Sequence, residues 1–386
     1  MSKTVRVLQF SPNGETDGIA RYQEQYVKAL SAIAGVETSF FDVTPFMFRA
    51  LSPDGQREAL EGLKKELAQY DILHIQHEFG LFGPGDFQKI VATAKQAGKK
   101  VVVSIHLSPK FAIKPAKLGG LGPRSLVYYL RQRRYARKMT MWNIEPLKLV
   151  DAVLVHDNTT AQAVQERGIA ADRIHTLPHP VYDFPEPPKS TLIAEKLNRQ
   201  EGDVIYCTVG MMHRYKGVYD AVRALKFLPE NYKLAIVGGV HPLSEDLPMY
   251  NKVCDLIDTL GLQSRVFITG FVHDDHRFNA LIRECDVCVY PYDGFYYAHV
   301  SSGAINLALS NHMPVIAYPT ETFKEISTNS NNAVVLTDTF AYYELARELQ
   351  SIDVSTQIEL SKAYAKDMAW PKMAAVLADL YQTLLG

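Results

Sequence analysis

The chain has 386 residues, of which 47% are hydrophobic and 22% are charged. This composition excludes a disordered or collagen-like polymer, and the length predicts two domains with large cores. Lys and Arg number 41 against 42 Asp and Glu, so the net charge of -1 argues against a dedicated nucleic-acid binder. The four cysteines lie in apolar runs and are too few for a disulfide framework, which predicts buried thiols in a reducing compartment.

Short, continuously apolar runs recur along the chain and are separated by helix-length segments. Such runs are typical of parallel strands that are covered on both faces. In the first half they lie at 5–10, 39–44, 72–76, 100–106 and 152–156. In the second half they lie at 204–210, 233–239, 265–271, 286–292 and 313–318. Helices between them serve as right-handed crossovers, so we predict an α/β fold of two doubly wound, Rossmann-like lobes.

Proline marks the boundary between the two predicted lobes. Residues 178–188 read PHPVYDFPEPP, with proline at five of eleven positions, which neither a helix nor a central strand tolerates. We expect an N-terminal lobe, a Pro-rich linker and a C-terminal lobe at 1–180, 181–202 and 203–365. A helical pattern covers about 356–386 and contains Trp370, a large side chain suited to docking.

Ligands of open parallel sheets bind beyond the carboxyl ends of the strands, so the segments after each run are candidate sites. Gly18 follows the first run and precedes a predicted helix, where a glycine turn either cradles an anion or sugar hydroxyl or is an ordinary connection. His106 ends the fourth run, where it either lines a cleft or is a structural histidine.

The third run carries four polar residues at its end. Strand alternation places His74 and Gln76 on one face, and we expect His77 and Glu78 to emerge at the end of the strand. Hydrogen bonds from His77 and Glu78 suit recognition of a sugar acceptor. A metal site needs more convergent ligands, and we expect no bound metal.

In the second half, Gly210 opens a loop that holds Arg214 and Lys216 and leads into a predicted helix. Two cations on a glycine-bounded loop at a helix N-terminus form a clamp for a diphosphate, whereas a solvated pair of surface charges is the alternative. Gly239 lies in a second glycine turn after a strand.

A third turn precedes the predicted helix AINLALSN. Its hydroxyls and free amides form an anion cup, or its serines cap the helix, and both can hold. The residues of this turn are His299, Ser301, Ser302 and Gly303.

The near-zero net charge hides a strongly basic segment. Residues 109–148 contain ten Lys and Arg but one acid, Glu145, so this segment carries +9 and the rest of the chain −10. Arg131 and Arg134 belong to it, and aromatic and leucine residues lie between its cations. Such a stretch either attracts anionic headgroups or a lipid-diphosphate acceptor, or is a solvated helical face.

The order and spacing of these motifs resemble GT-B glycosyltransferases, most of all the retaining family 4 group. The matching segments cover nearly the whole chain. They are DGIARY (17–22), QHEFGLFG (76–83), SIH (104–106), LPHPV (177–181), VGxxxxxKG (209–217), VGGVHP (237–242), FITGFV (267–272), PYD (291–293) with SSGA (301–304), and MPVIAYPT (313–320).

The resemblance implies a nucleotide-sugar donor in the C-terminal lobe, an acceptor in the N-terminal lobe, and an interdomain cleft. It also implies that residues 366–386 form a helix that crosses back to the first lobe. Lys216 matches the donor-phosphate lysine, with Arg214 in place of the usual arginine, and His106 matches the active-site histidine. It assigns the donor site to Gly18, Gly210, Gly239, Phe271, Val272, His299, Ser301, Ser302 and Gly303.

The sequence departs from the family at two positions. Most members carry two glutamates eight residues apart, and the corresponding residues here are His299 and Leu307. The chain resembles a subgroup in which His299, Ser302 and Gly303 take over donor binding. Loss of activity in this lobe is the alternative.

The resemblance therefore implies a metal-independent, retaining glycosyltransferase of cell-surface polysaccharide or glycoconjugate synthesis. His106, Arg214 and Lys216 are its candidate catalytic residues, and no cofactor is expected beyond the donor. A nucleotide-sugar epimerase and a non-catalytic sugar-nucleotide-binding subunit are the alternatives. The expected partners are a glycan or lipid-linked acceptor and an anionic membrane surface, for a cytoplasmic protein that attaches peripherally to the inner face of a membrane.

Overall fold

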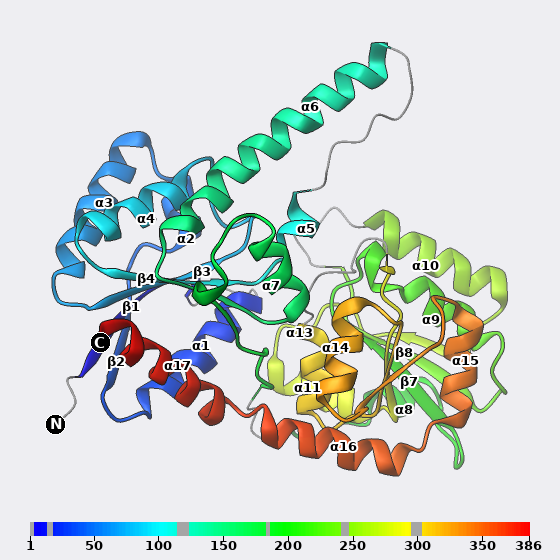
Figure 1. Cartoon of the computed structure of the whole chain (residues 1–386). Coiled ribbons are helices and arrows are strands. Elements are labelled where there is room, and N and C mark those ends of the chain that lie inside the picture. The colour runs from blue at the N-terminus through cyan, green and yellow to red at the C-terminus, as the bar shows by residue number, and fades with distance from the viewer. Residues whose placement is uncertain (1–3, 14–17, 114–122, 183–185, 241–246, 295–302) are drawn as a thin grey trace. The chain divides into compact units, whose positions relative to one another are not determined.

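The computed structural model describes residues 4–13, 18–113, 123–182, 186–240, 247–294 and 303–386. These residues form two compact lobes, each a parallel sheet with helices on both faces (Figure 1). The N-terminal lobe runs to His179 and also includes Trp370–Gly386, and the described residues from Pro180 to Ala369 form the C-terminal lobe. The predicted fold class, two Rossmann-like lobes, is confirmed.

The N-terminal sheet has six parallel strands in the order β2-β1-β3-β4-β5-β6. The strands are β1 (Val5–Phe10), β2 (Val36–Phe40), β3 (Ile72–His77), β4 (Lys100–Ile105), β5 (Ala152–Val155) and β6 (Ile174–Thr176). The strand predicted at 39–44 begins and ends earlier, because its pairing with β1 aligns Val36 with Val5. The three-residue β6 was not predicted, since its sequence IHT has no apolar run.

The side chains of the N-terminal strands alternate between two helical layers. One face packs against α1 (Gly18–Ser31) and α17 (Trp370–Leu385), and its cluster includes Val7, Ile72 and Val102. The helices that contribute to the opposite cluster are α2 (Pro45–Ala50), α3 (Pro53–Leu67), α4 (Asp86–Gln96) and α7 (Asn158–Gln165).

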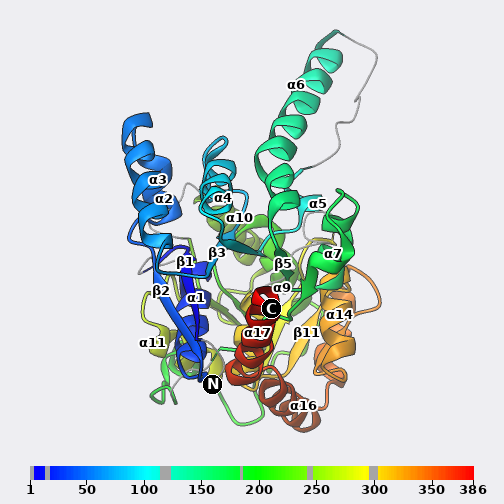
Figure 2. The same cartoon turned by 60° about the vertical axis from the view of Figure 1, so that its left-hand side comes forward.

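The segment after β4 contains the short helix α5 (Pro109–Ala112) and the longer α6 (Pro123–Met139). A π-helical turn (Thr140–Ile144) and a 3-10 turn (Glu145–Leu149) follow α6, and another 3-10 turn (Ala171–Arg173) precedes β6. Figures 1 and 2 both show α6 projecting from the rest of its lobe. Only its last turns, at Ala136 and Met139, pack against the core.

The C-terminal sheet also has six parallel strands, in the order β12-β11-β10-β7-β8-β9. The strands are β7 (Val204–Val209), β8 (Tyr232–Val237), β9 (Val266–Ile268), β10 (Val287–Tyr290), β11 (Val315–Ala317) and β12 (Val334–Leu336). Cys207 and Cys288 are register partners on β7 and β10 and are fully buried, as predicted for core thiols.

Helices cover both faces of this sheet. One layer consists of α9 (Val218–Leu225), α10 (Leu247–Leu260) and α15 (Tyr342–Ser351). The other consists of α8 (Leu192–Lys196), α11 (Asp275–Arg283), α13 (Gly303–Ser310), α14 (Glu321–Asn329) and α16 (Val354–Asp367). The segment expected as a linker contains α8, whose Ile193 is fully buried in this core.

The helix predicted over 356–386 is two helices, α16 in the C-terminal lobe and α17 in the N-terminal lobe. Trp370 begins α17 and is 4% exposed. Its ring lies edge-on to that of Tyr22 of α1, with the ring centres 5.1 Å apart. Near the other end of α17, the hydroxyl of Tyr381 lies 2.5 Å from His74 Nδ1 and hydrogen-bonds the hydroxyl of Tyr26. The helix is therefore an integral layer of the N-terminal lobe. Within the described residues, no helix combines the length and apolar character needed to cross a membrane.

We predict that Trp370→Ala lowers the free energy of unfolding of the N-terminal lobe by about 3–5 kcal/mol, because it leaves a cavity between α1 and α17. Urea unfolding followed by circular dichroism measures this loss. Val376→Ala is the control on the same helix, since Val376 is 54% exposed and a surface substitution changes stability by no more than about 0.5 kcal/mol. Equal stability of the two variants would contradict this role of α17.

Candidate active site

Three glycines shape the carboxyl edge of the C-terminal sheet. Gly210 directly follows β7 and its N–H donates to the Val237 carbonyl, while a Cβ on Gly238 would lie 2.1 Å from the Gly210 carbonyl oxygen. Gly217 has a φ of +68°, and a Cβ there would lie 1.7 Å from the Pro291 carbonyl oxygen. A side chain fits at neither Gly217 nor Gly238, so the loop between β7 and α9 packs directly on neighbouring backbone.

Lys216 is the half-buried cation of this loop. Its Nζ donates to the Tyr292 hydroxyl at 2.7 Å, lies 5.0 Å from the centre of the Tyr292 ring, and is 3.6 Å from the Cβ position of Gly210. Burial lowers the pKa of Lys216 from its ordinary value, and no carboxylate among the described residues pairs with it. A desolvated ammonium of this kind favours an incoming anion.

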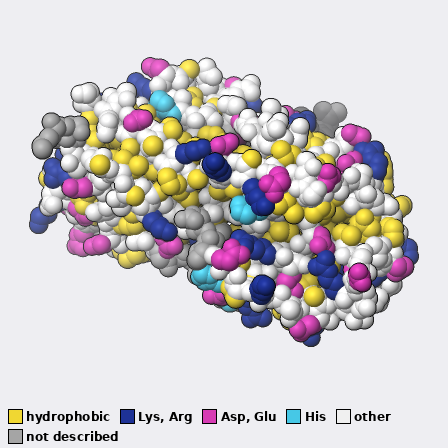
Figure 3. Space-filling view, turned by 90° about the horizontal axis from the view of Figure 1, so that it is seen from below, with side chains coloured by type: hydrophobic (Ala, Val, Ile, Leu, Met, Phe, Trp, Pro, Cys, Tyr) yellow, Lys and Arg dark blue, Asp and Glu magenta, His cyan; other side chains and the backbone are white. Residues whose placement is uncertain are grey.

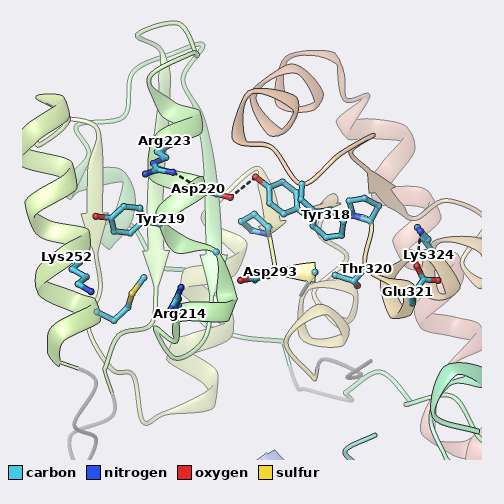
Figure 4. A pocket seen from close by; sticks show the side chains of 16 residues that line it. Arg214, Tyr219, Asp220, Arg223, Lys252, Asp293, Tyr318, Thr320, Glu321 and Lys324 are labelled. Atoms are coloured by element: carbon cyan, nitrogen blue, oxygen red, sulfur yellow. Dashed lines mark hydrogen bonds and ion pairs between the residues drawn. The ribbon is translucent and has the colours of Figure 1, made fainter. Parts of the chain in front are cut away.

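Arg214 faces different surroundings. Its side chain is exposed and lines a cavity of about 1060 Å³ together with residues of α9, α10 and the ends of β10 and β11 (Figure 4). Two of the charges along this cavity are neutralised locally, because Asp220 accepts from the Tyr318 hydroxyl at 3.1 Å and lies 3.8 Å from Arg223. A joint clamp by Arg214 and Lys216 stays a prediction.

The other residues predicted at the donor lie on neighbouring turns. Phe271 and Val272 follow β9 and are half-buried, with the Phe271 ring 4.5 Å from that of His273. Gly239 packs against Gly270, since a Cβ there would lie 3.0 Å from its backbone. Gly303 begins α13, whereas His299, Ser301 and Ser302 lie outside the described residues.

Leu307 occupies the position at which most family 4 members carry the second glutamate. It is 9% exposed and belongs to the hydrophobic core of the C-terminal lobe. The leucine in place of a glutamate therefore lies in the core and not at the surface.

In the N-terminal lobe, both ring nitrogens of the half-buried His106 have partners. Nε2 lies 2.7 Å from Gln76 Oε1, and Nδ1 lies 3.3 Å from His156 Nε2. The other nitrogen of His156 lies 3.0 Å from the Leu177 carbonyl oxygen. Burial, followed by the neighbouring His156, holds the pKa of His106 well below its ordinary value.

The residues around His106 come from separate parts of the chain. Tyr22, from α1, packs against three histidine rings. The distances from its ring centre to theirs are 4.9 Å for His106, 5.4 Å for His156 and 5.0 Å for His179. The sequence predicts no role for His156, contains His179 only within LPHPV, and predicts for Gln76 only that it shares a strand face with His74. The one available signal was position, because His106 and His156 each end a predicted run and directly follow a strand, β4 and β5 respectively.

The prediction that His77 emerges to contact an acceptor is wrong. Alternation along β3 directs its ring to the face opposite His74, where it is fully buried and packs 4.5 Å from Phe87 and 5.5 Å from Phe82. Its Nε2 lies 3.1 Å from Asn143 Oδ1, and burial lowers its pKa to about 4. Glu78, the next residue, is half-buried.

The remaining predicted residues lie at the surface. Gly18 is the exposed first residue of α1, and no described atom outside its own turn of the chain lies within 4 Å of a Cβ built on it. Arg131 and Arg134 are exposed on α6. In the described part of the chain, no group of three or more His, Cys, Asp or Glu side chains is placed to hold a metal ion.

Comparisons with known families match both halves of the chain. Residues 7–183 match the model described as Glycosyltransferase Family 4, and residues 189–364 match the model described as Glycosyl transferases group 1. No curated protein matches the sequence at the significance required.

Several solved structures share the fold over nearly their entire length. Anabaena HepE in complex with UDP is 14% identical with a TM-score of 0.70, covering 98% of this chain and 100% of HepE. Sucrose-phosphate synthase from Thermosynechococcus elongatus is 19% identical with a TM-score of 0.71, covering 99% of each chain. WaaG, a glycosyltransferase involved in lipopolysaccharide biosynthesis, is 16% identical with a TM-score of 0.62, covering 98% of this chain and 99% of WaaG.

The two family matches adjoin each other and together span nearly the whole chain, and the two parallel six-stranded sheets agree with the fold of these structures. The chain therefore belongs to the GT-B glycosyltransferases, with a family 4 N-terminal half and a group 1 C-terminal half.

Proposed function

We propose that the protein is a retaining glycosyltransferase that moves a sugar from a nucleotide-sugar to a glycan or lipid-linked acceptor in the synthesis of a cell-surface polysaccharide or glycoconjugate. The observation that carries this proposal is the half-buried ammonium of Lys216, which no described carboxylate neutralises. A diphosphate supplies the charge that this position lacks.

The chemistry follows from the charge that develops on the leaving group. As the bond between the sugar and the diphosphate breaks, negative charge grows on the phosphate oxygens, and a fixed cation in a site of low dielectric lowers the barrier. The helix α9 begins directly after Lys216 and Gly217, and no side chain caps its first turn. His106 would then orient the sugar or the acceptor hydroxyl from the N-terminal lobe.

The structural relatives indicate which donors to test first. HepE was solved with UDP and with UDP-glucose, and WaaG acts in lipopolysaccharide synthesis. We therefore propose a UDP-sugar as donor, to be compared with GDP- and dTDP-sugars by thermal shift, since a bound nucleotide stabilises the folded lobe by mass action.

We further propose that the acceptor lobe attaches to an anionic lipid surface through α6. The helix carries six Lys and Arg and no acid, and Leu126, Tyr128, Leu130 and Tyr135 are each more than half exposed. Arg133 lies 5.7 Å from the Tyr129 ring and Lys138 lies 5.6 Å from the Trp142 ring. Cations interleaved with exposed aromatic and leucine side chains are typical of interfacial segments.

The charge on α6 differs from that on the surface elsewhere. On the face shown in Figure 3, basic and acidic side chains lie intermixed. Because each Lys or Arg near an anionic surface contributes about 1 kcal/mol, α6 alone supplies enough attraction for reversible binding.

We predict that Lys216→Ala lowers transfer from the preferred nucleotide-sugar by about 100- to 1,000-fold, because it removes the cation at the leaving group. Lys226→Ala is the control, since Lys226 is exposed at the end of α9 in the same lobe. Transfer is measured with purified protein, and thermal unfolding confirms that both variants are folded. Near-normal turnover by the Lys216 variant would refute this role.

The same assay separates the alternative functions. Conversion of a nucleotide-sugar into its epimer without an acceptor would identify an epimerase. Binding of the donor without turnover in the presence of glycan and lipid-linked acceptors would identify a non-catalytic subunit, an outcome that the replacement of both glutamates would explain.

We predict that the wild-type chain sediments with vesicles of phosphatidylcholine and phosphatidylglycerol, and not with phosphatidylcholine alone. Replacing Arg131, Arg133, Arg134 and Arg137 with Gln lowers binding by roughly two to three orders of magnitude, because about 1 kcal/mol is lost per charge. In the control, four exposed lysines elsewhere are replaced with Gln: Lys64, Lys65, Lys226 and Lys366. Equal loss in both variants would show that net charge, not α6, governs binding.

A further inference from the structure

The hydrogen bonds around His106 specify where its hydrogens lie. The Leu177 carbonyl oxygen can only accept, so the hydrogen of a neutral His156 lies on Nδ1 and its Nε2 is bare. Gln76 presents Oε1 to His106, which likewise can only accept, so the hydrogen of a neutral His106 lies on Nε2 and its Nδ1 is bare.

The two bare nitrogens face each other. His106 Nδ1 and His156 Nε2 are 3.3 Å apart, a distance suited to a hydrogen bond between ring nitrogens. The series has three contacts: Gln76 with His106, His106 with His156, and His156 with the Leu177 carbonyl. Two neutral rings supply only two hydrogens, so the contact between the rings joins two lone pairs. One added proton converts it into the third hydrogen bond of the series.

We propose that His106 and His156 form a one-proton site, in which the two rings take up a single proton between them, and that Gln76 and His156 are positioning residues for His106. The consequence for the transfer reaction, which rests on the proposed function, is that His106 acts as a hydrogen-bond acceptor. Its single N–H is already used by Gln76, and the added proton, taken from solvent, occupies its free lone pair.

The groups around His106 and His156 keep the pair without its added proton near neutral pH. His156 is 7% exposed, and burial lowers its pKa, opposed by the hydrogen bond to Leu177 and by Asp157. Because the neutral form of the pair is favoured, the lone pairs are free above the joint pKa and are lost as the pH falls through it. The titratable groups around the pair are Tyr22 from α1, His74 and His77 from β3, Asp157 after β5, and His179 after β6.

The test is long-range proton–nitrogen NMR of the full chain with ¹⁵N-labelled histidine, which reports the tautomer and titration of each ring. At neutral pH we expect the hydrogen of His106 on Nε2 and that of His156 on Nδ1. On acidification, both rings should shift in one common step that corresponds to one proton. A hydrogen on Nδ1 of His106 at neutral pH would overturn the proposal, because Gln76 would then be donating to Nε2.

Two substitutions should change the step in different ways. Gln76→Glu places a carboxylate at His106 Nε2 and raises the joint pKa by about 1–3 pH units. His156→Phe removes the facing nitrogen, so the common step is lost and His106 titrates alone. His175→Gln is the control, since His175 is a half-buried histidine on β6 outside this series. An unchanged titration of His106 in His156→Phe would refute the pairing, and thermal unfolding monitors the fold of each variant.

The activity measurement is separate from the NMR measurement. If the protein transfers sugar, the acid limb of its pH–rate profile should move to higher pH in Gln76→Glu, in step with the NMR midpoint. A coupled NMR step without transfer by the wild-type chain would refute the proposed function and leave the one-proton site standing. Transfer whose acid limb stays in place while the NMR midpoint moves would refute the positioning role.

Discussion

Polar side chains on a parallel sheet that helices cover on both faces are shielded from water, so they must find hydrogen-bond partners within the protein. This constraint organises the N-terminal lobe. His74, Gln76 and Ser104 lie on the sheet face toward α1 and α17 and are almost fully buried. His74 Nε2 lies 2.8 Å from Ser104 Oγ, and its Nδ1 meets the hydroxyls of Tyr26 and Tyr381. The last helix of the chain thus completes the hydrogen bonding of a strand more than 300 residues earlier.

The same buried polar layer reaches the edge of the sheet where the chemistry is expected. Gln76 lies between His74 and His106, so the orientation of the candidate active-site histidine is set from the interior of the lobe. In the C-terminal lobe, the loops at the carboxyl edge of the sheet pack at glycines such as Gly217. One lobe therefore presents neutral hydrogen-bonding rings, and the other presents the unneutralised cation of Lys216.

The architecture was predictable because apolar runs reveal buried parallel strands directly, whereas much of the site was not. The period of two correctly placed His74 and Gln76 together, but it could not show that Phe82 and Phe87 cover His77 on the other face. His156 was missed because its role depends on a contact across strands, 50 residues from His106. The strand β6 reads IHT and has no apolar run, and the apolar segment around β12 is shorter than the runs that marked the other strands.

Leu307 shows what the absence of the second glutamate means for the core of the C-terminal lobe. A carboxylate at this buried position would be desolvated by the core and would need a ligand hydroxyl to offset that cost. Leucine packs in the same core and needs no polar partner there. Under the proposed function, position 307 offers the donor no carboxylate, so the binding free energy of the donor depends more on its diphosphate at Lys216.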